Sequence, residues 1–194
     1  MYYKAIRMLK KIILLICKSE IEYGSNAIID WNVKINNNRN RLIIGKNVYL
    51  RSIQKGYQAG MPFPTNLLID VKNATIQIGN NTRINGAYIH AQKSICIGEN
   101  CVIASGVNII DSNGHNLYST NRTIGRDTPK DIKIGNNVWI GLNAVILKNT
   151  NIGNNSVISA GSVVKGDFPP NSLIVGNPGI LVKKIEKNEN RYSQ

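Results

Sequence analysis

A hydrophobic residue recurs at every sixth position over residues 134–164, and this period limits the folds open to the chain. The aliphatic positions are Ile134, Ile140, Ile146, Ile152, Ile158 and Val164, and a second register four residues later holds Val138, Ala144, Thr150, Ser156 and Ser162. Six is not the helical period, but it equals three strand alternations, so all these side chains point to one side of an extended chain. Strands of a β-sandwich do not keep one phase over six units. The pattern therefore predicts a parallel β-helix with the aliphatic residues stacked inside.

Turn-forming residues separate the aliphatic positions, and the same pattern extends toward the N-terminus. Glycine and asparagine follow the repeat at Gly135, Asn136, Asn137, Gly153, Asn154 and Asn155, and both residue types tolerate left-handed backbone angles. Earlier units begin at Ile76, slip by one residue between Ile84 and Ile89, and recover at Ile95. In the loose first part of the repeat we expect Ile28, Val33, Leu42 and Ile44 to face inward.

These boundaries divide the chain into a basic amphipathic N-terminal helix (1–20), a β-helix domain (21–180) and a basic C-terminal tail (181–194) containing a short helix. Two segments that break the period, 51–66 and 112–130, are predicted to be loops extruded from the coils. The uninterrupted apolar run at 12–17 is too short to span a bilayer. The N-terminal helix is therefore expected either to lie on an anionic membrane surface or to cover the open end of the solenoid.

The composition points to an anionic partner and offers no metal site or disulfide framework. Lys and Arg number 24 against 11 Asp and Glu, a net charge of +13, which favours a nucleotide, a phospholipid surface, an acidic glycan or nucleic acid. Cys17, Cys96 and Cys101 show no paired spacing. Two histidines without nearby cysteine ligands make a poor zinc site. No nucleophile elbow, P-loop or dinucleotide-binding glycine motif is present.

Because the interior of a β-helix is filled with side chains, functional residues are expected on an outer face or in the loops. His115 lies in the polar segment 112–130 beside Gly114, and an exposed loop histidine suits a general base near neutral pH. The alternative is an ordinary surface histidine. His90 is predicted to be an outward strand residue with a structural role.

The ladder, with His115 in a loop before the run Ile134-Gly-Asn-Asn-Val-Trp-Ile-Gly141, resembles the hexapeptide-repeat acyltransferases. It is most similar to the maltose and galactoside O-acetyltransferase branch and to the polysaccharide-modifying O-acetyltransferases. The resemblance implies an all-β, left-handed parallel β-helix, a homotrimer with active sites between neighbouring prisms, and acetyl-CoA as co-substrate without a metal. The cysteine usage fits a cytoplasmic location, and the basic stretch 1–18 is expected to allow peripheral contact at the inner face of the membrane.

On the acceptor side, the resemblance makes His115 the catalytic base that removes the proton from an acceptor hydroxyl. Asn85 stands where the family has an acceptor-contacting asparagine. The family's acidic acceptor-binding residue has no match, because Ala91 and Gln92 stand there, which argues against a plain maltose or galactoside acceptor. The group that orients His115 is left open between Asp111, a backbone carbonyl and a residue of the next subunit.

On the coenzyme side, the resemblance assigns six residues: Trp139, Gly141, Leu142, Ala160, Lys165 and Lys183. A backbone amide near Gly141 and Leu142 would donate to the thioester oxygen, and the two lysines would meet phosphates. Ala160 would provide a flat surface for the pantetheine arm. Trp139 is expected either to stack on the coenzyme or to be buried between subunits.

The resulting hypothesis is an acetyl-CoA-dependent O-acetyltransferase that modifies a sugar hydroxyl in bacterial capsule or O-antigen synthesis. A second hypothesis keeps the enzyme class and changes the acceptor to a nucleotide-sugar amine or an antibiotic hydroxyl. A third is a non-catalytic solenoid that binds an anionic glycan or nucleic acid. The stacking aromatics expected of single-strand nucleic-acid binders are sparse, so no nucleic-acid partner is predicted.

Overall fold

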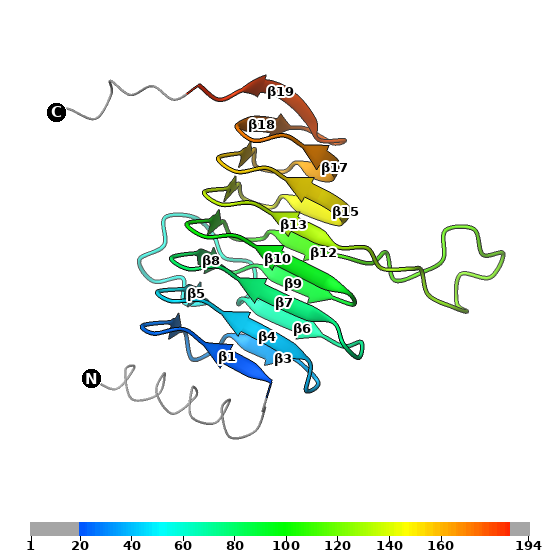
Figure 1. Ribbon diagram of the computed structural model, residues 1–194, viewed down its shortest axis with the longest axis horizontal. Coiled ribbons are helices and arrows are strands. Elements are labelled where there is room, and N and C mark those ends of the chain that lie inside the picture. The colour runs from blue at the N-terminus through cyan, green and yellow to red at the C-terminus, as the bar shows by residue number, and fades with distance from the viewer. Residues whose placement is uncertain (1–19, 187–194) are drawn as a thin grey trace.

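A computed structural model describes residues 20–186, which form an all-β prism of stacked coils (Figure 1). Each complete coil adds one strand to each of three faces, which we call A, B and C, and successive coils pair in parallel. Face A contains β1 (Ile21–Tyr23), β4 (Arg41–Ile44), β7 (Thr75–Ile78), β10 (Ser94–Ile97), β13 (Ile132–Ile134) and the C-terminal parts of β15 (Val145–Ile152) and β17 (Val163–Phe168). Face B contains β2 (Ile28–Ile29), β5 (Tyr49–Arg51), β8 (Arg83–Asn85), β11 (Val102–Ile103), β14 (Trp139–Ile140), β16 (Val157–Ile158) and β18 (Ser172–Val175). Face C contains β3 (Lys34–Asn36), β6 (Asn66–Ile69), β9 (Tyr88–Ala91), β12 (Asn108–Ile110) and the N-terminal parts of β15 and β17.

The hexapeptide positions form the core, as predicted. The six aliphatic residues from Ile134 to Val164 are each 0–2% exposed, and so are the five small or β-branched residues of the second register. Ile residues of the earlier units stack in register on them, as in the pairing of Ile95 with Ile76 and with Ile132. Each coil thus contributes one or two buried aliphatic residues per strand to the interior, and those six residues apart lie on successive faces, which agrees with the period of six.

Asparagines close the turns between faces A and B. Asn47, Asn81 and Asn100 adopt positive φ angles of 55–57°, and their side-chain amides form a ladder: Asn47 Nδ2 donates to Asn81 Oδ1 at 2.9 Å, and Asn81 Nδ2 donates to Asn100 Oδ1 at 3.2 Å. The ladder recurs between Asn137 and Asn155 at 3.0 Å. These turns use the left-handed conformation that asparagine tolerates best after glycine.

Two predictions about the ends of the solenoid are wrong. Ile28 is 42% exposed and Ile29 is the inward residue at 4%, since a shift of one residue in a strand exchanges its two sides. The predicted C-terminal helix is instead strand β19 (Ile180–Lys184), which runs antiparallel to β18 after a turn at residues 176–179. An extended segment can add to the open edge of β18, which a helix cannot do. The predicted N-terminal helix lies outside the described residues, as do residues 187–194.

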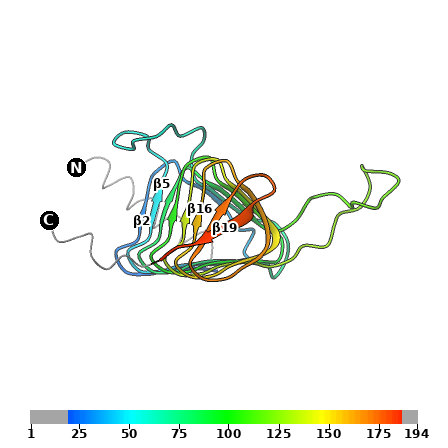
Figure 2. The same ribbon diagram turned by 90° about the horizontal axis from the view of Figure 1, so that it is seen from above.

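Two long loops leave the prism at different corners (Figure 2). Loop 52–65 connects β5 to β6, between faces B and C, and loop 111–131 connects β12 to β13, between faces C and A. The first of these corners explains why Ile84 and Ile89 are five residues apart instead of six. The turn of the third coil is one residue shorter there, and Gly86, at φ +57°, lies beneath loop 52–65.

Candidate functional site

Loop 52–65 is bonded to the prism along its length. At its start, the buried Asp30 carboxylate accepts hydrogen bonds from the amides of Ser52 and Ile53 at 2.9 and 3.0 Å. In the middle, Ser105 donates its hydroxyl to Gly60 O and its amide to the Tyr57 hydroxyl. This loop therefore forms part of the surface at the corner between faces B and C.

Loop 111–131 is anchored at its base by a carboxylate whose side chain is 6% exposed. Asp127 accepts hydrogen bonds from the hydroxyl of Ser112, the amide of Asn113 (2.8 Å) and the ammonium group of Lys148. Burial raises the pKa of Asp127, and these three donors lower it by more, so the pKa ends below its ordinary value. The base of the loop is thus fixed to the corner between faces C and A.

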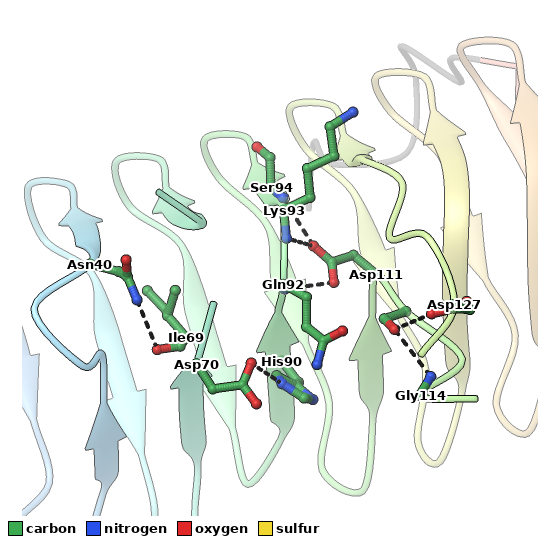
Figure 3. A network of polar contacts seen from close by, with 11 residues as sticks. Asn40, Ile69, Asp70, His90, Gln92, Lys93, Ser94, Asp111, Gly114 and Asp127 are labelled. Atoms are coloured by element: carbon green, nitrogen blue, oxygen red, sulfur yellow. Dashed lines mark hydrogen bonds and ion pairs between the residues drawn. The ribbon is translucent and has the colours of Figure 1, made fainter. Parts of the chain in front are cut away.

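Asp111 turns the chain out of the prism at the start of this loop (Figure 3). Its buried carboxylate accepts hydrogen bonds from the amides of Gln92, Lys93 and Ser94 at 2.7, 2.7 and 2.9 Å. Burial raises the pKa of Asp111 although the three amides oppose that shift. Both carboxylate oxygens serve this corner, so within one chain Asp111 has a structural role and does not orient His115.

The two histidines differ as the sequence predicts. His115 is exposed on loop 111–131, and within residues 20–186 its ring has no hydrogen-bond partner or ion pair. His90 projects outward from β9, where its Nε2 lies 2.9 Å from Asp70 Oδ1 and its ring contacts the edge of Tyr88. His115 is therefore accessible to a substrate, whereas His90 is held in a side-chain network.

Four of the six predicted coenzyme residues lie together on face B and at its corner with face C. Trp139 is 55% exposed and lies in register between Val102 and Val157. Gly141 packs so closely on the next coil that an added Cβ would lie 2.6 Å from Ala160 N. The turns at Gly141 and Ala160 therefore stack closely, and neither residue has a long side chain. This surface suits the linear pantetheine arm of a coenzyme lying along the backbone.

Of the two predicted backbone donors, only one is free. Gly141 N–H donates to Ile158 O at 2.8 Å in the coil-to-coil ladder. Within the described part of the chain, Leu142 N–H has no such partner. Leu142 is therefore the better candidate for the donor to a developing oxyanion.

The other predicted site residues are dispersed within one chain. Lys165 is exposed at the corner between faces C and A, beside a cavity of about 480 Å³ under loop 111–131. Lys183 lies on β19 in register with Leu173. Asn85 ends β8 at the corner covered by loop 52–65; its side chain is 1% exposed, and its Nδ2 donates to Ile103 O at 2.9 Å. His115 and Asn85 thus belong to different corners of one prism.

Comparison with known proteins agrees with this fold. Residues 131–166 match the family model described as bacterial transferase hexapeptide (six repeats). Over these residues the chain is similar to the hexapeptide-repeat transferases. It is 38% identical over 120 residues to the galactoside O-acetyltransferase of Escherichia coli (strain K12), which covers 61% of this chain and 59% of that relative. The match thus spans less than two thirds of the relative's length.

Two solved structures extend the comparison. A galactoside acetyltransferase in complex with coenzyme A superposes with a TM-score of 0.61 at 25% identity, covering 99% of this chain and 86% of that one. A hexapeptide-repeat-containing acetyltransferase of Vibrio cholerae O1 biovar eltor, complexed with acetyl coenzyme A, gives a TM-score of 0.57 at 32% identity, covering 62% and 65%. Both superpositions show that the fold of this chain is similar to that of the two acetyltransferases.

One group of candidate residues is not predicted from the sequence. Arg51, Tyr57 and Arg83 line a second cavity, under loop 52–65, together with Asn85. The arginines lie one coil apart, and only the pairing of β5 with β8 brings them to one place. Two arginines at outward positions of successive repeats are the only signal in the sequence.

Proposed function

We propose that this protein is an acetyl-CoA-dependent O-acetyltransferase acting on a sugar hydroxyl, with His115 as general base. The observation that carries the proposal is the exposed, unpaired His115 on a loop anchored to hexapeptide coils like those of the named acetyltransferases. The narrow surface at Gly141 and Ala160 and the lysines at 165 and 183 fit a coenzyme with a linear arm and phosphates.

In the proposed reaction, the His115 imidazole accepts the proton of the acceptor hydroxyl while the hydroxyl oxygen forms a bond to the thioester carbonyl carbon. Leu142 N–H donates to the carbonyl oxygen as negative charge develops there. The carbon–sulfur bond then breaks, and His115 returns the proton to the departing thiolate. Transfer is direct, so no covalent acetyl-enzyme is required.

The proposal includes a left-handed winding of the β-helix and its assembly as a homotrimer. The homotrimer is proposed because His115 and Asn85 lie at different corners of one chain. A neighbouring copy could bring loop 111–131 against the corner between faces B and C, so that one site contains His115 of one copy and Asn85, Trp139 and Leu142 of the other. The exposed apolar side chains on this loop, Leu117, Tyr118 and Ile124, support such a contact. The lysines at 165 and 183 would then approach the coenzyme from two subunits.

We place the reaction in the synthesis of a bacterial surface glycan, where the net charge of +13 favours an anionic acceptor or membrane surface. Within residues 20–186 there is no helix long and apolar enough to cross a bilayer. Contact with the membrane through residues 1–18 stays a prediction, testable by liposome flotation with and without them. An amine or antibiotic acceptor is the alternative within the same enzyme class.

Thiol release from acetyl-CoA in the presence of a panel of sugar acceptors tests the proposal. Replacing His115 by Ala should reduce acceptor-dependent release by about a hundred- to ten-thousandfold, which is the usual contribution of a general base. His90→Gln is the matched control, because it alters the other histidine and keeps a hydrogen-bonding side chain beside Asp70. Equal rates in wild type and His115→Ala would exclude His115 as the base.

A further inference from the structure

A cavity of about 230 Å³ lies between face B and loop 52–65. We call it the arginine pocket, and its lining residues are Arg51, Gly56, Tyr57, Gln58, Arg83 and Asn85. Two guanidinium groups line it and no carboxylate does. Its charge is therefore suited to an anionic ligand.

Two residues that line the arginine pocket each have a buried polar atom without a hydrogen-bond partner within residues 20–186. These atoms are the acceptor Asn85 Oδ1 and the donor Arg51 Nε. The Asn85 side chain is 1% exposed, and its amide nitrogen is held by Ile103 O, so the orphan oxygen cannot exchange roles with it. Buried polar groups are normally paired. The unpaired donor, Arg51 Nε, suits an anionic group of a ligand. The unpaired acceptor, Asn85 Oδ1, suits a hydroxyl group of the same ligand.

The strand register and the loop preorganise these groups. Arg51 pairs with Asn85, and Tyr49 pairs with Arg83, so all four project from two adjacent strands of face B. The Arg51 guanidinium lies 5.0 Å from the ring centroid of Tyr49 and 5.8 Å from that of Tyr57. Stacking on aromatic rings restricts a guanidinium group and leaves its edge for hydrogen bonds to an anion.

No carboxylate neutralises these arginines in residues 20–186. Neither Arg51 nor Arg83 forms an ion pair there, whereas Arg41, on face A, forms one with Glu22 at 3.0 Å. The loop that closes the pocket is fixed by Ser105 and Asp30, so the pocket is present before a ligand binds.

We propose that the arginine pocket binds the acceptor sugar and selects one that carries an anionic group, either a carboxylate or a phosphate. Arg51 and Arg83 hold the anion, and Asn85 Oδ1 accepts a hydrogen bond from a neighbouring sugar hydroxyl. The inference rests on the proposed function in taking the bound sugar to be the acetyl acceptor. It makes Arg51 and Arg83 the residues that determine specificity.

The test is direct binding to the full 194-residue chain, measured by calorimetry without acetyl-CoA. The probes are methyl glycosides of galacturonate, glucuronate and N-acetylneuraminate, the 1-phosphates of galactose and glucose, and neutral methyl galactoside. At least one anionic probe should bind at least tenfold more tightly than the neutral one, and the uronosides and sugar phosphates separate the two sources of charge. Arg83→Gln should weaken that probe by about ten- to a hundredfold, which corresponds to one charge-assisted hydrogen bond.

Arg83 is the first choice for substitution because it is exposed, whereas Arg51 also supports loop 52–65 through Tyr57. Arg41→Gln is the matched control, an exposed arginine on face A outside the pocket. Anionic probes that bind no better than methyl galactoside, or bind Arg83→Gln as tightly as wild type, would overturn the inference. Tight, Arg83-dependent binding without acetyl transfer would support this pocket and count against the proposed reaction.

Discussion

The two long loops of this protein leave similar coils but are held in different ways. Loop 52–65 is bonded to the prism at its start and middle through Asp30 and Ser105, and at its end the Thr65 hydroxyl accepts a hydrogen bond from Gly86 N–H. Loop 111–131 is bonded mainly at its base, where Asp127 joins Ser112, Asn113 and Lys148. The first loop is therefore part of the prism surface, and the second extends away from it (Figure 2).

The apolar side chains of the two loops follow the same division. Met61 and Phe63 of loop 52–65 are partly buried against the prism, whereas Leu117, Tyr118 and Ile124 of loop 111–131 are 65%, 89% and 68% exposed. Exposed apolar groups that gather on one segment mark an interaction surface. One loop completes a pocket within its own chain, and the other exposes apolar side chains, which fits the subunit contact proposed above.

The largest effect is expected from making the exposed loop polar. In the double variant Leu117→Ser/Ile124→Ser, each subunit contact should lose roughly 3–6 kcal/mol, the value of burying two such side chains. The proposed trimer should then dissociate at concentrations where wild type stays assembled, as sedimentation velocity would measure. Val71→Ser is the control, because Val71 is an exposed apolar residue in a turn outside both loops. Unchanged assembly of the double variant would place loop 111–131 outside the contact.

A smaller effect is expected from Gly86→Ala. This variant tests whether loop 52–65 needs its close packing on Gly86. The new Cβ would lie 2.4 Å from Met61 Cγ and 2.8 Å from Phe63 O, at a φ of +57°. Overpacking and left-handed strain together should cost about 2–4 kcal/mol of unfolding free energy. Gly56→Ala shares the positive φ but meets nothing within 4 Å, so about 1 kcal/mol is expected. Urea denaturation of both variants would separate the cost of the steric clash from the cost of the positive φ angle. Equal losses of unfolding free energy would contradict the close packing of Met61 and Phe63 on Gly86.

The sequence predicts the stacked core well because a period of six repeats the same environment at every coil. Ile140 and Ile158, for example, occupy equivalent positions and are both fully buried. The prediction fails where a strand is too short or too near an end to fix its register, as at Ile28. Strand β19 was also missed, because its pairing depends on the free edge of β18 and not on a pattern of its own.

The candidate site is harder to predict because its residues meet only through coil stacking. His115 could be selected from its loop and the family resemblance, but the pairing of Arg51 with Asn85 follows from strand register. The one-residue slip after Ile84 was visible in the sequence. Its cause, a shortened corner beneath loop 52–65, required the position of Gly86 relative to Met61.

The smallest effect is expected at the base of loop 111–131. There the stabilisation by the mostly buried Asp127–Lys148 pair can be compared with that by the exposed Lys93–Asp131 pair. Asp127→Asn removes the charge that Lys148 contacts. It should lower the free energy of opening of the loop base by about 1–3 kcal/mol. Lys93→Met, which removes a bridge to Asp131 whose partners are 53% and 41% exposed, should cost less than 1 kcal/mol. Hydrogen exchange of the loop amides, compared between variant and wild type at each pH, measures both.

The difference in loop-amide exchange between wild type and Asp127→Asn should depend on pH, which gives a further check on the role of Asp127. Since the folded pKa of Asp127 lies below its ordinary value of 3.8, its carboxylate stabilises the loop base fully above that value. The contribution is lost as the pH falls below 3.8 and through the folded pKa, so wild type should come to resemble Asp127→Asn only in acid. A difference that disappeared near neutral pH would mean that Asp127 is not the ionised anchor. A difference that persisted after the Asp127 carboxylate of the folded protein had been protonated would mean that packing, and not charge, holds the loop to its corner.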